Sequence, residues 1–297
     1  MALGEQSPGH PSPAAEPCAT MPAVSTTASP LEPAALFVRD GTLLVPTIYT
    51  QGPWNPEAQH GGPVCAALAW LIESVPTLVP MQVSRFTFDL FRAAPLTPLG
   101  TATRVVREGK RLQVVEAMLL DGDVPIARGS AMRLREIDLA EVGEHPQRPR
   151  HTVSPPSGTG TTMRPDVAAR IGFLRGIEVD RVAGTPGGGP PSTTWYRSRV
   201  PLIEGEAMSP LQRLSLFADF TSASALYLDH ASYSAINPDV TVQVLRPPVG
   251  EWICVDGATE SGTNGIGHSR ASLYDIAGFV ASASTSQLID RVRSPFA

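Results

Sequence analysis

The chain has 297 residues, of which 42% are hydrophobic and 17% are charged, and its net charge is −5 at pH 7. No basic cluster interrupts this acidic balance, so nucleic acid, which needs a cationic face, is excluded as a partner. No apolar run is long enough for a transmembrane helix, so no membrane span is expected. The three cysteines (Cys18, Cys65 and Cys254) have no paired spacing. They predict free thiols in a reducing cytoplasm rather than a disulfide framework or a metal site.

Residues 1–34 are rich in proline, serine and alanine and lack the basic start and apolar core of a secretory signal, so we expect a disordered tail. The apolar run 63–73 is dominated by small side chains and predicts a helix that packs closely against a sheet. Residues 86–92 alternate apolar and polar side chains, which predicts a strand. Turn signals at 107–110 and 121–122 then separate further antiparallel strands. The first folded region is predicted to be 35–140.

A linker is expected over 141–169, and a second folded region over 170–297. The second region begins with a predicted hairpin, whose strands are Gly176–Val182 and Thr194–Val200 and whose turn is 186–191. A helix is predicted over 211–228, with Pro210 near its first turn. Strands are predicted at 240–246 and from Gly278 to Asp290, with a glycine-rich turn at 261–265.

The two regions match at a constant offset. Thr87 and Arg92 correspond in this way to Thr241 and Arg246, which follow them by 154 positions. At the same offset, Leu119-Leu120-Asp121 corresponds to Leu273-Tyr274-Asp275. Because the strand phase agrees as well, the sequence predicts an internal duplication. Each half is one mostly apolar helix followed by long antiparallel strands, which is an α+β arrangement.

Four short motifs carry a resemblance to a known family. They are Gln59-His60-Gly61-Gly62 before the first helix, Phe217-Ala218-Asp219-Phe220 on the second helix, Asn237-Pro238-Asp239 before a strand, and Ser284-Thr285-Ser286-Gln287 on the last strand. The chain resembles the acyl-CoA thioesterase II and thioesterase-like superfamily over roughly 36–140 and 170–293. The resemblance implies a double hot-dog fold, with two antiparallel sheets that each wrap a central helix and that pair edge to edge.

The resemblance also implies a site in the second half. In that family an aspartate on the second helix, a threonine before the next strand and a glutamine on the last strand hold the attacking water. The matching positions here are Asp219, Asn237 and Gln287, and Asn237 departs from the family's threonine. In the first half, Val83 and Arg133 stand where Asn237 and Gln287 stand in the second. One water site per chain is therefore expected.

These residue types suit thioester hydrolysis. A carboxylate can accept the proton of the attacking water, and amide side chains can orient that water without titrating. Backbone N–H groups at Gly61-Gly62 can polarise the carbonyl oxygen. We expect His60, Gly61, Gly62, Phe217 and Phe220 to bind substrate, and neither a metal nor an organic cofactor is expected. The acyl tail is expected in a tunnel lined by Phe217, Phe220, Leu226, Phe86 and Phe88.

The predicted function is the hydrolysis of an acyl-CoA to free acid and coenzyme A by a cytoplasmic homo-oligomer. Two alternatives stay open. Asn237 in place of threonine favours a protein that binds an acyl or aryl thioester without hydrolysing it. The second alternative is an enoyl-CoA hydratase or dehydratase that uses His60 as a catalytic residue, although the first half offers no partner acid at a matching position. Ser269 in Gly267-His268-Ser269-Arg270-Ala271 resembles a nucleophile elbow, but its surroundings predict a strand followed by a turn.

Overall fold

The computed structural model describes Met1 and residues 34–143, 152–158, 161–162, 169–184, 192–223, 228 and 232–291. Nearly all of the predicted tail, the turn 186–191 and Leu226 lie outside these residues. Residues 33–297 form one compact unit, so both predicted halves belong to the same body. The finer division into 35–140, 141–169 and 170–297 stays a prediction.

The first half follows the predicted order, one helix and then a meander of long strands. Its elements are β1 (Phe37–Asp40), β2 (Leu43–Pro46), the short 3-10 helix η1 (Ile48–Thr50), α1 (Gly61–Glu73), β3 (Met81–Leu90), β4 (Gly100–Arg107), β5 (Leu112–Asp121) and β6 (Val124–Arg135). Helix α1 begins two residues before the predicted apolar run, and almost all of its side chains are buried. Both predicted turns are confirmed, because β5 begins after 107–110 and β6 after 121–122.

The second half repeats this order after an additional hairpin. Its elements are β7 (Thr161–Thr162), α3 (Gly172–Arg175), β8 (Ile177–Ala183), β9 (Ser192–Ser198), α4 (Pro210–Ala218), α5 (Phe220–Ala223), β10 (Tyr233–Ile236), β11 (Asp239–Val244), β12 (Ile253–Ser261), β13 (Ile266–Asp275) and β14 (Gly278–Arg291). The predicted hairpin is confirmed, since β8 and β9 pair antiparallel. Ser269 lies within β13, buried and bonded to Thr259, as the strand prediction required.

The prediction of one continuous helix over 211–228 was wrong, because the helix is interrupted at Asp219 between α4 and α5. The side-chain amide of Asn237 donates to the main-chain carbonyl of Asp219 at 3.3 Å and also to its carboxylate at 3.0 Å. A carbonyl bonded from outside is drawn away from the regular helical ladder. Periodicity alone gives no sign of such an outside partner.

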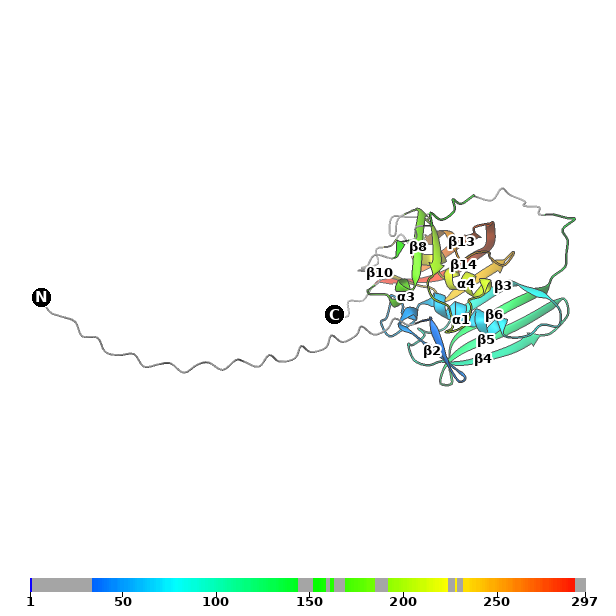
Figure 1. Cartoon of the computed structure of the whole chain (residues 1–297), viewed down its shortest axis with the longest axis horizontal. Helices are drawn as coiled ribbons and strands as arrows, with labels where there is room; N and C mark the ends of the chain where they lie inside the picture. Colours follow the sequence, from blue (N-terminus) through cyan, green and yellow to red (C-terminus); the bar gives the residue numbers. More distant parts are fainter. Residues whose placement is uncertain are drawn as a thin grey trace. The chain divides into compact units, whose positions relative to one another are not determined.

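The strands of both halves join in one 12-stranded antiparallel sheet within the described residues (Figure 1). Its main order is β4-β5-β6-β3-β11-β14-β13-β12-β9-β8-β7. The halves meet where β3 pairs with β11, so the expected sheets are joined edge to edge. At this junction Thr87 lies opposite Thr241, its partner at the 154-residue offset. Equivalent residues that face one another in antiparallel strands are related by a local two-fold axis. The strand order outward from the junction follows the same axis, with β3, β6, β5 and β4 on one side and β11, β14, β13 and β12 on the other.

The two long helices pack against each other beside the sheet (Figure 1). Helix α1 also contacts β3 to β6, and α5 contacts β12 to β14. The start of α1 lies at the end of α4 and the start of α4 lies at the end of α1, because His60 contacts Asp219 while Ser209 contacts Glu73. The helices are therefore antiparallel. At each end of the pair, the start of one helix lies beside a carboxylate at the end of the other.

Candidate functional site

Asp219 lies at the interruption between α4 and α5 and is buried, with only 4% of its surface exposed. Its Oδ1 accepts a hydrogen bond from Nδ2 of Asn237 at 3.0 Å. Asn237 is in the short link between β10 and β11, so two segments of the second half meet at this carboxylate. The structure therefore brings together Asp219 and Asn237.

His60 is the third member of this cluster. It is the residue before α1, and its Nδ1 lies 3.0 Å from Oδ2 of Asp219. The same nitrogen lies 3.1 Å from the Gly62 N–H, but Nδ1 cannot both accept that hydrogen and donate one. We assign the hydrogen on Nδ1 to Asp219, because the Gly62 N–H is also bonded to this carboxylate. The partner acid of His60 comes from the second half of the chain, where the search for one in the first half could not find it.

The two glycines after His60 are required by close approach. A Cβ on Gly61 would lie 2.7 Å from Oδ1 of Asp219, and a Cβ on Gly62 would lie 2.5 Å from the Leu216 carbonyl. Neither distance is possible for a side chain, so any other residue would push α1 away from α4. The glycines thus hold the start of α1 against the carboxylate, which the sequence predicted only in general terms.

The carboxylate of Asp219 is stabilised in its charged form. Burial by itself would raise its pKa, but hydrogen bonding and charge from His60, the Asn237 amide and the Gly62 N–H hold the pKa below the usual aspartate value. Asp219 is therefore ionised at neutral pH although it is surrounded by protein. A buried, ionised carboxylate with a pKa set by specific partners is a feature of functional sites.

Gln287 lies on β14, on a buried position of the strand. Ile236 pairs with Leu288, so Asn237 and Gln287 occupy neighbouring positions on adjacent strands. Among the described residues, neither the oxygen nor the nitrogen of the Gln287 amide has a hydrogen-bond partner, and Oδ1 of Asn237 has none either. Buried polar atoms are almost always hydrogen-bonded, so three unpaired atoms in one region indicate a place for a water or a substrate group.

Aromatic rings pack against His60 and against one another next to the site. The His60 ring lies 4.7 Å from that of Phe173 and 5.2 Å from that of Phe220, centroid to centroid. Tyr196 stacks on Phe220 at 4.4 Å and on Phe217 at 5.7 Å. Sequence reasoning missed Phe173 and Tyr196, because a one-turn helix and the first hairpin of the half carried no motif. The two Tyr196 pairs are stacked and the two His60 pairs are tilted, at separations typical of packed aromatic rings.

The opposite end of the helix pair has a different set of residues. Glu73, at the end of α1, accepts hydrogen bonds from Ser209 at 2.7 Å and from Gln212 at 2.9 Å. Arg133, the counterpart of Gln287, is buried and donates to Oε1 of Gln113 at 2.9 Å and to backbone carbonyls of the first half. These contacts join side chains to other groups of the protein, so this end has the character of a structural network.

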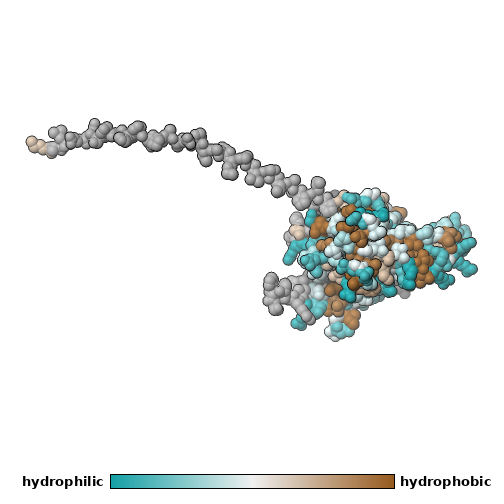
Figure 2. Space-filling view, turned by 90° about the horizontal axis from the view of Figure 1, so that it is seen from below, coloured by the Kyte–Doolittle hydropathy of each residue, from teal (hydrophilic) through white to brown (hydrophobic). Residues whose placement is uncertain are grey.

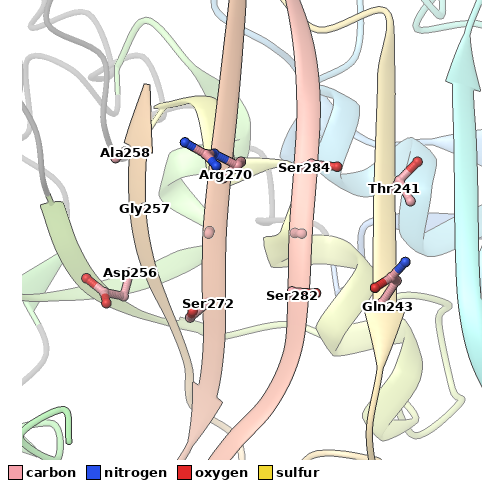
Figure 3. A pocket seen from close by; sticks show the side chains of 11 residues that line it. Thr241, Gln243, Asp256, Gly257, Ala258, Arg270, Ser272, Ser282 and Ser284 are labelled. Atoms are coloured by element: carbon pink, nitrogen blue, oxygen red, sulfur yellow. The ribbon is translucent and has the colours of Figure 1, made fainter. Parts of the chain in front are cut away.

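The phenylalanines predicted to line the acyl tunnel lie in the interior of the protein. Phe86, Phe88 and Phe217 are fully buried core residues, and Phe220 is 5% exposed. A separate pocket of about 550 Å³ lies over β11 to β14 and is lined by small polar side chains such as Thr241, Ser272, Ser282 and Ser284 (Figure 3). None of the predicted site residues lines this pocket.

The molecular surface in Figure 2 shows hydrophilic and hydrophobic residues interspersed over the face in view. Within the described part of the chain, no helix is long and apolar enough to cross a membrane. The same residues contain no cluster of three or more histidine, cysteine, aspartate or glutamate side chains with metal-binding geometry.

Solved structures with similar folds include a protein assigned as a thioesterase II from Thermobifida fusca YX, with a TM-score of 0.66 and 19% identity over 87% of this chain and 96% of that one. A hot-dog protein of unknown function from Alicyclobacillus acidocaldarius has a TM-score of 0.66 and 16% identity over 88% and 97% of the two chains. The acyl-CoA thioesterase II TesB2 from Mycobacterium marinum has a TM-score of 0.57 and 14% identity over 82% and 97%. These likenesses establish a hot-dog type of fold.

No curated protein matches the sequence significantly. Two models of one family match consecutive parts of the chain. The acyl-CoA thioesterase N-terminal domain matches residues 50–134, and the acyl-CoA thioesterase C-terminal domain matches residues 146–288. The first match includes His60 and the glycines, and the second includes Asp219, Asn237 and nearly all of β14. Both halves of the chain are thus accounted for by a single family in the expected order, and the chain belongs to the acyl-CoA thioesterase family of thioester-hydrolysing enzymes.

Proposed function

We propose that the chain hydrolyses an acyl-CoA to a free acid and coenzyme A, with a water held by Asp219, Asn237 and Gln287. The observation that carries this proposal is the ionised, buried Asp219 carboxylate beside amide atoms that lack partners. A water placed there would donate to an amide oxygen of Asn237 or Gln287 and accept from the Gln287 amide nitrogen, groups without another partner among the described residues. No other buried carboxylate among the described residues combines these two features.

The reaction then needs only groups of the chain, water and substrate. Asp219 accepts a proton from the water as the water oxygen attacks the thioester carbonyl carbon. Asn237 and Gln287 fix the orientation of the water, which reduces the entropy lost on reaching the transition state. The tetrahedral intermediate collapses with cleavage of the carbon–sulfur bond. The proton held by Asp219 returns to the thiolate, so free acid and thiol leave and the carboxylate is regenerated.

The start of α1 stabilises the charge that forms on the carbonyl oxygen. Helix α1 is 13 residues long, so its first N–H groups carry the positive end of a full helix dipole. Gly61 supplies an N–H group at this end without a side chain to exclude the substrate, whereas the Gly62 N–H is already bonded to Asp219. His60 orients Asp219, and Phe217 and Phe220 form the apolar wall against which the acyl group packs.

Two other functions are separated from hydrolysis by the same assay. Asn237 already donates its amide to Asp219, which favours a site that binds a thioester without activating water. The contact between His60 and Asp219 favours a histidine–carboxylate pair acting on enoyl-CoA. Thiol release should be measured across C2 to C18 acyl-CoAs, together with hydration of enoyl-CoA. Binding without release would replace hydrolysis by the first alternative, and hydration without release would replace it by the second.

The proposal extends to the assembly and to the two halves of the fold. Each half is a hot-dog unit whose strands wrap its own helix, and the two units are related by the local two-fold axis at Thr87 and Thr241. We further propose a cytoplasmic homo-oligomer. Light scattering on the purified protein tests the oligomeric state, and a mass of 31.5 kDa, that of a single chain, would contradict it.

A further inference from the structure

An exposed cation lies next to the site, in the segment that follows β3. Leu90, the last residue of this strand, donates its N–H to the Pro238 carbonyl at 2.8 Å. The Ala94 carbonyl accepts from the Gln59 N–H, also at 2.8 Å. Arg92 lies midway between these two anchors. Since consecutive Cα atoms are about 3.8 Å apart, its backbone stays close to both of them.

The two anchors connect Arg92 to both sides of the site. Pro238 is the direct neighbour of Asn237, and Gln59 is the direct neighbour of His60. The exposed segment 91–93 therefore forms part of the rim between the segments that carry these two residues. Arg92 therefore lies beside the site rather than at the reacting atoms.

The second half contains a structural counterpart of Arg92. Arg246 follows β11 at the same distance at which Arg92 follows β3. The backbone is bonded in the same way in both halves, with Phe91 N–H to the Ile126 carbonyl at 3.0 Å and Leu245 N–H to the Val280 carbonyl at 2.9 Å. Each pair is related by the 154-residue offset, so the two arginines occupy equivalent places.

Only one of the two arginines is held by an ion pair. Arg246 donates to the buried Asp275 carboxylate, with Nη2 to Oδ1 at 2.7 Å. The counterpart of Asp275 in the first half is Asp121, so an acid is present at the equivalent position there too. Nevertheless Arg92 and Asp121 are both exposed, and within the described residues neither side chain makes an ion pair or a hydrogen bond. The arginine beside the site is thus the one left available to a ligand.

The surroundings of Arg92 favour an anionic ligand with a flat ring. Nearby Asp89 is bound to Arg128, at 2.8 Å, so its charge is already balanced. Two further acids lie near this rim: Glu57 is exposed on the neighbouring segment, and the partly exposed Asp239 lies opposite Asp89 and accepts from the Ser286 N–H at 2.9 Å. Phe91, 51% exposed, presents an aromatic face and lies 5.8 Å from the Arg128 guanidinium. The chain as a whole has a net charge of −5, so a polyanionic substrate needs a local cation.

We propose that Arg92 binds a phosphate of coenzyme A and that Phe91 packs against its adenine ring. This inference rests on the proposed function, since it assigns the entrance of the same site. The pantetheine arm separates the phosphates of coenzyme A from the thioester, so a residue at the rim meets them while Asp219 meets the reacting carbon. A guanidinium is well matched to a phosphate by its paired donors.

The test compares Arg92→Ala with the wild-type protein on two thioesters of the same acyl group, the acyl-CoA and the acyl-N-acetylcysteamine, which lacks phosphates. Arg92→Ala is expected to raise KM for the acyl-CoA about fivefold with kcat unchanged, because an exposed charge pair contributes modestly in water. Kinetics on the phosphate-free thioester are expected to stay the same. Lys110→Ala removes an equally exposed cation at the turn between β4 and β5 and is the matched control.

The KM effect is also expected to shrink at high salt, because exposed charges are screened. An unchanged KM for the acyl-CoA, or an equal change on both thioesters, would overturn the assignment. Calorimetric binding of free coenzyme A to wild-type and Arg92→Ala protein requires no turnover. If no thioester is hydrolysed, the proposed function fails, while a loss of coenzyme A affinity in the variant would still support Arg92, and equal affinity would refute it.

Discussion

Replacing Asp219 by asparagine tests the proposed chemistry most directly. The new side chain has nearly the same shape, but it has one amide nitrogen where the carboxylate has a second acceptor oxygen. The carboxylate now accepts from Asn237 at 3.0 Å on one oxygen and lies 3.0 Å from His60 on the other. Whichever way the new amide is turned, its nitrogen faces one of these donors, so one of the two contacts is lost.

The effect on turnover should be much larger than the effect on folding. Loss of a general base costs about 100-fold or more in rate, which is about 2.7 kcal/mol of transition-state stabilisation. The lost hydrogen bond costs roughly 1–3 kcal/mol of stability, and removal of a buried charge offsets part of that. Asp219→Asn is therefore expected to remain folded and to lose thiol release with an acyl-CoA that the wild-type protein hydrolyses. Circular dichroism and a thermal melt monitor folding.

Glu73→Gln is the matched control, since Glu73 is a carboxylate at the corresponding end of the partner helix and also accepts side-chain hydrogen bonds. It removes one negative charge and should leave kcat within about twofold, because surface and structural changes away from the reacting atoms shift energies by a few tenths of a kcal/mol. Unchanged turnover in Asp219→Asn would refute the assignment of the base. An equal loss in Glu73→Gln would show that any charge change at the helix ends disturbs the enzyme.

Three further predictions follow from individual contacts. Gln287→Leu removes two buried amide atoms without partners, so the melting temperature should stay the same or rise while thiol release falls about tenfold or more; a lower melting temperature with full activity would contradict this. Gly61→Ala would place a Cβ 2.7 Å from the Asp219 carboxylate and should reduce kcat about tenfold or more, whereas Gly100→Ala, whose nearest contact is an ordinary 3.5 Å, should not. Burial raises the pKa of Glu73 above its unfolded value despite hydrogen bonds from Ser209 and Gln212, so the wild-type protein loses stability as pH rises from 4.5 through the raised pKa. Glu73→Gln does not titrate, so its melting temperature relative to wild type should increase over that interval and then level off; a difference independent of pH would contradict the reasoning.

Local sequence determined most of the elements. The alternation at 86–92 and 240–246, the small-residue helix at 63–73 and the turn signals each describe residues that interact with near neighbours, and β3, β11 and α1 formed where they were expected. The repeat at 154 residues predicted two similar units, and the resemblance to hot-dog proteins predicted that their sheets pair edge to edge, as β3 and β11 do.

The tertiary structure decided what local sequence could not express. The interruption of the second helix at Asp219 depends on an amide supplied by Asn237, and the partner acid of His60 comes from the other half of the chain. Likewise, the same sequence features surround Arg92 and Arg246, yet within the part of the chain that the structure describes only Arg246 is held by an ion pair. Periodicity indicates which face of a segment is buried. Each of these contacts depends instead on which side chain from a distant segment lies within hydrogen-bond distance of a given atom. Contacts of that kind exist only once segments that are far apart in the sequence have folded against each other.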